Sequence, residues 1–246
     1  PAEPEKNEPP DPALKTLLSV KNDFSVDEAS VVLTDGKTKL RLPRGADAYD
    51  RPFASGWPRC VREVESERNL ANIHGTFYEI PRGKNGLGLM RPVASHNRQI
   101  NDFCTWNGLL VLSGVELDSK PNEHIYKSGD GKVSLWFGGI DDLWKLGKPI
   151  GKGGPLKNAS VSANAPSDAY LMTGYDKKTL EITADKDVKI ALEVDFDHQS
   201  GWHKYKSFDV KAGSTTKYEF EEGFSAHWVR AVSDKDCVAS VQFTYE

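Results

Sequence analysis

The sequence RPVASHNRQINDFCTWNGLLVLSG, residues 91–114, carries the strongest local signal for the fold. Asn107-Gly108 separates an apolar segment from the apolar run 109–112, and this pattern predicts a two-residue β-hairpin. We therefore expect two buried antiparallel strands here. A polar cluster at the mouth of such a hairpin indicates either a binding site or a buried hydrogen-bond network. Its members are His96, Asn97, Arg98, Asn101 and Asp102.

Short apolar segments separated by turn signals continue along residues 25–150. Asp35-Gly36 and the segment 128–131 (SGDG) are further turns, and the spacing of roughly 8–12 residues is typical of all-β folds. We predict propeller-like antiparallel blades here, or else a small β domain. Two four-stranded blades fit residues 31–146, whereas a complete propeller needs at least about four. An upstream region or another chain would then have to complete the propeller.

Two further boundaries follow from composition. Residues 1–24 open with PAEPEKNEPPDP, a segment rich in proline and acid that predicts an extended linker or arm. The segment 147–155 (GKPIGKGGP) predicts a domain boundary. After it, short segments of alternating polarity separated by turn residues predict a β-sandwich over residues 155–246.

Net charge and hydropathy argue against two classes of partner, nucleic acid and the membrane interior. The net charge of −4 gives no electrostatic footprint for nucleic acid. We expect no membrane span, because no apolar run approaches the roughly 20 residues that one requires. The sequence begins at Pro1 without a basic and apolar leader, which we interpret as a processed form or a fragment. The scattered Cys60, Cys104 and Cys237 favour buried free thiols, although a Cys60–Cys104 pair stays open.

Three parts of the sequence together carry a family resemblance. They are HGTFYEIPR (74–82), LWFGGIDDLWKLGKPIGKGGP (135–155), and DAYLMTGYDKK with HWVRAVSDKDC within 168–237. They resemble the C-terminal portion of large bacterial secreted proteins, often of planctomycete type, in which a β-propeller precedes a β-sandwich. The resemblance implies a secreted or periplasmic location and a polysaccharide or oligosaccharide as partner. It supplies no catalytic motif.

The candidate catalytic residues are His74, Tyr78, His96, Arg98 and Asp102. In β-elimination of an acidic sugar, an arginine neutralises the uronate carboxylate while histidine or tyrosine moves the protons. The same histidines with Cys104 or Asp102 offer zinc ligands, but no HxxxH or CxxC spacing supports a metal site. The favoured alternative is that these side chains satisfy one another and the backbone.

Paired acids and aromatic residues give two more candidate sites. Asp141-Asp142 beside Trp144 suits glycoside hydrolysis, although neighbouring strand residues face opposite sides and a turn with solvated acids is favoured. Aromatic side chains can stack on sugar rings or fill a hydrophobic core. Each candidate sugar-binding residue therefore has packing in the core as its alternative role. The candidate sugar platforms are Trp106, Trp144, Trp202 and Trp228.

No cofactor is predicted, and calcium is a minor candidate. Asp195 and Asp197 in the loop DFDHQSG (195–201) offer two oxygen ligands without the full calcium-binding series. The sequence thus leaves two functions open. One is a carbohydrate-active protein, as a polysaccharide lyase or glycoside hydrolase. The other is a non-catalytic module that binds glycan or protein.

Overall fold

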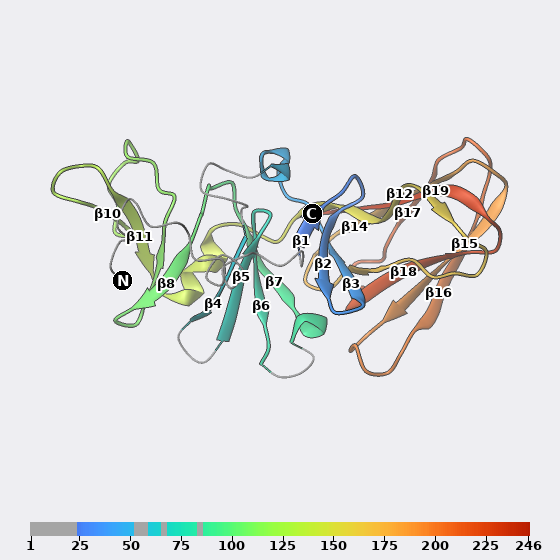
Figure 1. The fold of residues 1–246 in the computed structure, drawn as a ribbon, viewed down its shortest axis with the longest axis horizontal. Helices are drawn as coiled ribbons and strands as arrows, with labels where there is room; N and C mark the ends of the chain where they lie inside the picture. Colours follow the sequence, from blue (N-terminus) through green and yellow to red (C-terminus); the bar gives the residue numbers. More distant parts are fainter. Residues whose placement is uncertain (1–23, 52–58, 65–67, 83–85) are drawn as a thin grey trace, which may run out of the picture.

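The computed structural model describes residues 24–51, 59–64, 68–82 and 86–246, and this part of the chain is built from β-strands (Figure 1). The predicted all-β class is confirmed. Four sheets are present among the described residues, with three short 3₁₀ helices at Asp47–Asp50 (η1), Leu87–Leu89 (η3) and Ile140–Lys145 (η4). The predicted arm over residues 1–24 lies outside the described residues, apart from Phe24.

The first four-stranded sheet is an antiparallel meander in the order β4-β5-β6-β7. Its tightest turn joins β5 to β6 at His74-Gly75, where φ is 52° and 81°. Positive φ at both central residues matches the right-handed twist of a hairpin. The strands are β4 (Arg59–Val64), β5 (Arg68–Ile73), β6 (Thr76–Ile80) and β7 (Arg91–Ser95).

The second four-stranded sheet contains the predicted Asn-Gly hairpin. Asn107 and Gly108 have φ of 47° and 81°, and Trp106 pairs with Leu109 across the turn. The sheet order is β10-β11-β9-β8, and all pairs are antiparallel. The strands are β8 (Phe103–Trp106), β9 (Leu109–Leu112), β10 (Ile125–Lys127) and β11 (Ser134–Gly138).

These two sheets share one hydrophobic cluster. The rings of Phe77 on β6 and Phe103 on β8 meet edge to face at 5.7 Å, and Leu110, Leu112 and Trp136 are buried beside them. The opposite face of the β4–β7 sheet is also buried, because Tyr78 and other residues of β5 and β6 belong to the core of the C-terminal strands. Burial on both faces agrees with the burial of four of the five residues of β6.

The remaining strands form two sheets that line one core. One has seven strands in the order β1-β2-β3-β13-β18-β15-β16, and the other has the order β12-β19-β14-β17. The first contains β1 (Phe24–Val26), β2 (Val31–Asp35), β3 (Thr38–Leu42), β13 (Ala169–Leu171), β15 (Val188–Asp195), β16 (His203–Val210) and β18 (Trp228–Ser233). The second contains β12 (Gly151–Val161), β14 (Lys178–Ala184), β17 (Thr216–Glu219) and β19 (Cys237–Tyr245).

The hairpin β2–β3 does not lie with the strands that follow it in sequence. Leu40 and Arg41 of β3 pair in parallel with Ala169 and Tyr170 of β13, so residues 31–42 belong to a sheet of the C-terminal strands. The prediction instead grouped this hairpin with residues 43–150. The β8–β11 sheet lies at one end of the molecule, the β4–β7 sheet lies in the middle, and the two sheets of the C-terminal strands lie at the other end (Figure 1).

Candidate functional site

Buried side chains form hydrogen bonds to the backbone of the polar segment 96–101, which lies between β7 and β8. His96 is 7% exposed, and its Nδ1 accepts the Arg98 backbone N–H at 3.2 Å. Its Nε2–H therefore donates to Asn72 Oδ1 at 2.9 Å. The Asn72 amide in turn donates to the Ile100 carbonyl at 3.1 Å. The two side chains thus fix both ends of a short exposed loop.

Tyr49 completes this support. Its hydroxyl donates to the Arg98 carbonyl at 2.8 Å and lies 3.3 Å from the His96 carbonyl. Its ring centroid lies 5.7 Å from the His74 ring and 6.1 Å from the His96 ring. Gly75 must lack a side chain here, because a Cβ would lie 2.5 Å from the Tyr49 ring.

His74 is also buried, and its ring holds the chain on both sides of the start of η1. Its Nδ1 accepts the Gly45 backbone N–H at 3.0 Å, so its Nε2–H donates to Asp50 Oδ1, also at 3.0 Å. Asp50 is also ion-paired with Arg44. Burial lowers the pKa of His74 below its ordinary value even with Asp50 beside it, and burial lowers the pKa of His96 to about 4. Both imidazoles are therefore neutral at pH 7.

The loop carried on this support forms one wall of a groove of about 490 Å³. We call it the amide groove, and six of its residues are polar: Asn97, Arg98, Gln99, Asn101, Glu116 and Ser119. Within the described part of the chain, none of these six side chains has a hydrogen bond or ion pair. Polar side chains at the surface often have no partner within the protein, but here six of them line one hollow.

The opposite wall of the amide groove starts at Gly114, where β9 has ended. Its φ is +79°, and a Cβ there would lie 1.7 Å from the Gln99 carbonyl oxygen. The two walls therefore approach at backbone distance, which only glycine permits. Val115 and Ile125 supply the apolar part of the lining.

The five predicted catalytic residues do not share one solvent-open cleft. His74 and Tyr78 are 0% exposed and His96 is nearly so, which removes all three from contact with a large substrate in this conformation. Tyr78 faces the C-terminal core, where burial raises its pKa to about 12. Of the five, Arg98 alone lines the amide groove.

Asp102 does not join the other four predicted catalytic residues in one site. It bonds instead to two residues of a neighbouring strand. Its Oδ1 accepts the Cys60 thiol at 2.8 Å, and its Oδ2 pairs with Arg62 at 2.8 Å. Both partners come from β4, so Asp102 ties β4 to the start of β8. All three cysteines are free, and Cys104 is exposed rather than buried as predicted.

The predicted sugar platforms have different environments. Trp228 is fully buried and donates its indole N–H to the Gly88 carbonyl at 2.7 Å, so its ring has no exposed face on which a sugar could stack. Trp202 is partly buried, and the Arg230 guanidinium lies 4.3 Å from its ring centroid. Trp106 and Trp144 are 59% and 65% exposed.

Trp106 lies on an apolar side of its sheet, on which Val111 is buried and Leu135 and Phe137 are half-buried. Side chains alternate across β8–β11, so the strand residues that do not enter the core point to the opposite side of the sheet. We call this surface the outer apolar face, and its members are Cys104, Trp106, Leu109, Val111, Tyr126, Leu135 and Phe137. Phe137 lies 6.3 Å from Trp106 and 5.6 Å from Tyr126, ring to ring. None of the seven is charged.

The paired acids and the calcium candidate have local structural roles. Asp142 accepts the Gly139 N–H at 2.8 Å and pairs with Lys145 at 2.7 Å, so Asp141-Asp142 lies in the capped first turn of η4. Asp195 accepts the backbone N–H of His198 at 2.8 Å, and Asp197 accepts that of Ser200 at 2.7 Å. The described residues contain no group of three or more His, Cys, Asp or Glu that could hold a metal ion.

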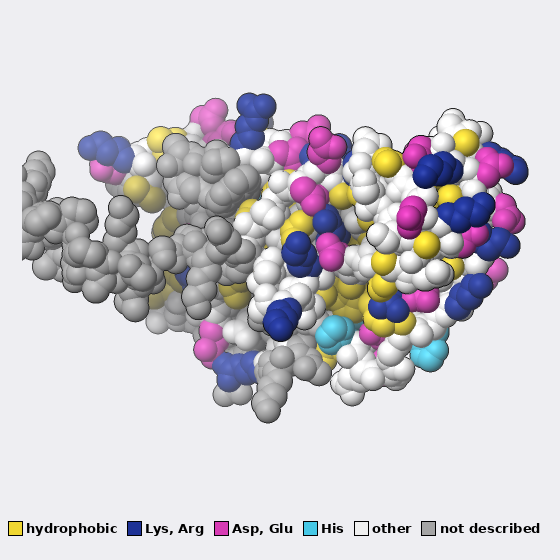
Figure 2. All heavy atoms as spheres, turned by 45° about the vertical axis from the view of Figure 1, so that its right-hand side comes forward, with side chains coloured by type: hydrophobic (Ala, Val, Ile, Leu, Met, Phe, Trp, Pro, Cys, Tyr) yellow, Lys and Arg dark blue, Asp and Glu magenta, His cyan; other side chains and the backbone are white. Residues whose placement is uncertain are grey.

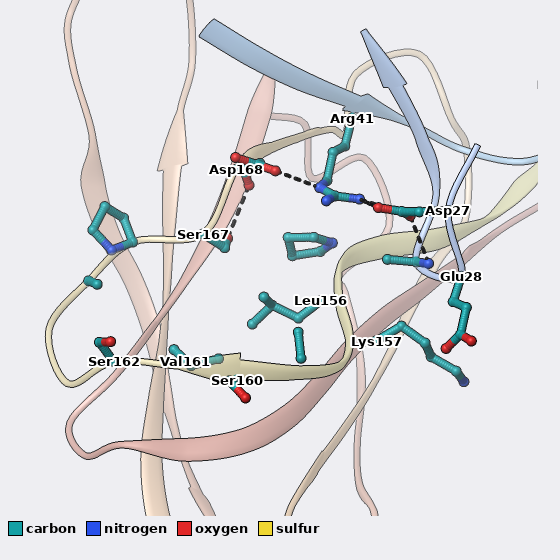
Figure 3. A pocket seen from close by; sticks show the side chains of 15 residues that line it. Asp27, Glu28, Arg41, Leu156, Lys157, Ser160, Val161, Ser162, Ser167 and Asp168 are labelled. Carbon is teal, nitrogen blue, oxygen red and sulfur yellow. Dashed lines mark hydrogen bonds and ion pairs between the residues drawn. The ribbon is translucent and has the colours of Figure 1, made fainter. Parts of the chain in front are cut away.

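A larger hollow of about 550 Å³ lies beside β12 (Figure 3). Arg41 points into it from β3, but its guanidinium is bonded to Asp168 at 2.9 Å and to Asp27 at 2.8 Å. The Arg41 guanidinium, which is the main cation of this hollow, is therefore already neutralised. Side chains of both charges are also interspersed over the C-terminal sheets (Figure 2), as is usual for a solvated surface. The amide groove is the stronger candidate because all six of its polar side chains are unpaired among the described residues, whereas Asp27, Arg41 and Asp168 of the hollow beside β12 bond to one another.

Sequence reasoning singled out Asn97, Arg98 and Asn101 but missed Gln99, Glu116 and Ser119. A partial signal was available, because Gly114 follows an apolar run and the polar residues Glu116 and Ser119 come soon after it. No described helix is long and apolar enough to cross a membrane. Comparisons with protein-family models, curated proteins and solved structures gave no match.

Proposed function

We propose that this chain is a non-catalytic glycan-binding part of a secreted or periplasmic protein that acts on or binds polysaccharide, and that the amide groove holds the glycan. One observation carries the proposal. Six polar side chains line a single groove, and none has a partner within the described part of the chain. Their hydrogen-bonding capacity is free for a ligand, and the loop that carries four of them is fixed by buried side chains.

The chemistry of the lining suits a ligand rich in hydroxyl groups. Asn97, Gln99 and Asn101 each offer an amide that both donates and accepts, Arg98 only donates, and a carboxylate such as Glu116 only accepts. A sugar hydroxyl also donates and accepts, so it can bond to every member of this set. The groove is pre-organised because the neutral His96 bonds to the loop backbone.

Binding is favoured over catalysis by the environment of the candidate proton-transfer groups. General acid–base catalysis needs a titratable side chain within hydrogen-bond reach of the substrate. His74, His96 and Tyr78 are buried, and both ring nitrogens of each histidine are already used. They support the groove from below and do not line it.

We also propose the finer architecture expected from the sequence. The β4–β7 and β8–β11 sheets would be two propeller-like blades, because each has four antiparallel strands and they share one core cluster. The seven-stranded sheet and the β12-β19-β14-β17 sheet would form a β-sandwich, because they line a common core. The hairpin β2–β3 would then belong to the sandwich.

The test is binding of a polysaccharide panel to the purified chain, followed by a single substitution. Gln99→Ala removes one amide from the groove and should weaken binding about 2- to 13-fold, which corresponds to one net hydrogen bond of roughly 0.5–1.5 kcal/mol. Gln199→Ala is the matched control, because Gln199 is equally an exposed glutamine and lines a separate hollow beside the loop after β15. Equal affinities for both variants, or no binding to any polysaccharide, would refute the proposal.

The outer apolar face favours a second candidate function, an assembly module. Its seven uncharged residues resemble those that β8–β11 bury on the inner side, and exposed apolar patches mark interaction sites. A β-sheet from a second copy of this chain would cover the face. In this case the purified chain should exceed its monomer mass of 27.3 kDa, and Trp106→Glu should restore the monomer. A monomeric wild-type chain at 100-fold varied concentration would argue against self-assembly.

A further inference from the structure

Arg98 stands out among the arginines of the structure. Five others whose side chains are described form ion pairs with carboxylates; they are Arg41, Arg44, Arg62, Arg82 and Arg230. Arg51, Arg91 and Arg98 form no ion pair within the described part of the chain. Of these three, Arg98 lines the amide groove.

The backbone of Arg98 is held on both sides. Its N–H donates to His96 Nδ1, and its carbonyl accepts the Tyr49 hydroxyl. These bonds come from buried groups and leave the guanidinium, with its five donors, without an internal partner. An arginine so placed loses little backbone freedom when it binds a ligand, and its planar fork matches a carboxylate in two parallel hydrogen bonds.

Glu116 is the other charged member of the amide groove. It forms no ion pair with Arg98, so the two charges do not satisfy each other. The groove therefore has a free cation and a separate free acceptor. A neutral sugar would use the acceptor and leave the cation without a counter-charge, whereas an acidic sugar would use both.

We propose, on the basis of the proposed function, that the glycan held in the amide groove is acidic, and that Arg98 bonds to the carboxylate of a uronic acid residue. Glu116, Asn97, Gln99 and Asn101 then bond to hydroxyl groups of the same chain of sugars. Arg98 is a specificity-determining residue for binding, and no covalent step is involved.

The experiment compares acidic polysaccharides with their neutralised forms. Polygalacturonate and alginate are each paired with their methyl ester, and dextran sulfate is paired with dextran. Affinities are measured by isothermal titration calorimetry at 50 mM and 300 mM NaCl. We expect at least one uronate to bind tenfold or more tightly than its ester, with the difference reduced at the higher salt because ion pairs are screened.

Two variants locate the effect. Arg98→Gln should lower the affinity for the uronate about tenfold and change the affinity for the ester less than twofold. Arg91→Gln is the matched control, because Arg91 is also exposed and unpaired but does not line the groove, and it should bind as the wild type does. Circular dichroism and urea unfolding of both variants check that the fold is retained.

Several results would overturn the inference while the proposed function stands. They are binding of neutral glycans alone, equal affinity for uronate and ester, binding only of the sulfated polymer, and an equal loss for uronate and ester in Arg98→Gln. Failure of every polysaccharide to bind would overturn the proposed function as well. The two claims are therefore distinguishable in one set of titrations.

Discussion

Acid should destabilise the protein through His96, the histidine that supports the amide groove. Its pKa is lowered by burial to about 4 in the folded chain, from an ordinary value of 6.5. The unfolded chain therefore binds a proton at this residue more readily than the folded chain does. Stability from His96 is present above pH 6.5 and is lost as pH falls from 6.5 toward 4.

The folded and ordinary pKa values of His96 determine how much the free energy of unfolding changes with pH. Between pH 7.5 and pH 5.0 the free energy of unfolding should fall by about 2 kcal/mol from His96 alone. Burial lowers the pKa of His74 and His227 too, so these residues change stability in the same direction. His96→Gln removes the titrating group, and its unfolding free energy should therefore depend on pH by about 2 kcal/mol less than that of the wild type.

Urea unfolding followed by tryptophan fluorescence at the two pH values measures this difference. The comparison uses the change with pH in each protein, so a constant cost of the substitution cancels. A proton NMR titration of the imidazole resonances gives the pKa of His96 independently. The account of the buried support would be refuted by a pKa near 6.5, or by equal pH dependence of the wild type and His96→Gln.

Three further substitutions or modifications test the other structural assignments. Gly114→Ala should weaken glycan binding and destabilise the chain by about 1–3 kcal/mol, because its Cβ would collide with the Gln99 carbonyl; unchanged urea unfolding and affinity would contradict this. Trp228→Phe should cost roughly 1–3 kcal/mol of stability by leaving the buried Gly88 carbonyl unpaired, with glycan affinity unchanged, whereas lost affinity in a stably folded variant would restore its stacking role. A thiol reagent should modify Cys104 in the native chain and spare Cys60, whose pKa burial raises to about 12; a native count of three modified thiols would argue against this burial.

Much of the strand pattern could be predicted from the sequence because its signals are local. Asn107-Gly108 requires positive φ at both positions, and that requirement places the hairpin without knowledge of any distant residue. The alternation in 178–184 and 188–195 likewise reflects which side of each strand is buried. The pairing of β3 with β13 joins residues 129 positions apart, and no local pattern reports it.

The candidate site was less accessible from sequence, for a physical reason. His74 and His96 have polar rings, and nothing nearby in sequence shows that Asp50 and Asn72 would satisfy them inside the protein. Their bonds cross 24 residues in each case, so burial and exposure could not be distinguished. Arg98 was singled out because most residues of its loop are polar.

The central claim is that the amide groove is where the glycan binds. The most direct test is a ¹⁵N–¹H NMR titration of the labelled chain with the tightest-binding oligosaccharide, following side-chain NH₂ and indole resonances. We predict saturable shifts of the NH₂ pairs of Asn97, Gln99 and Asn101, while the exposed Trp106 and Trp144 indoles do not shift. Shifts at either indole with unchanged groove amides would contradict the account and place the glycan elsewhere.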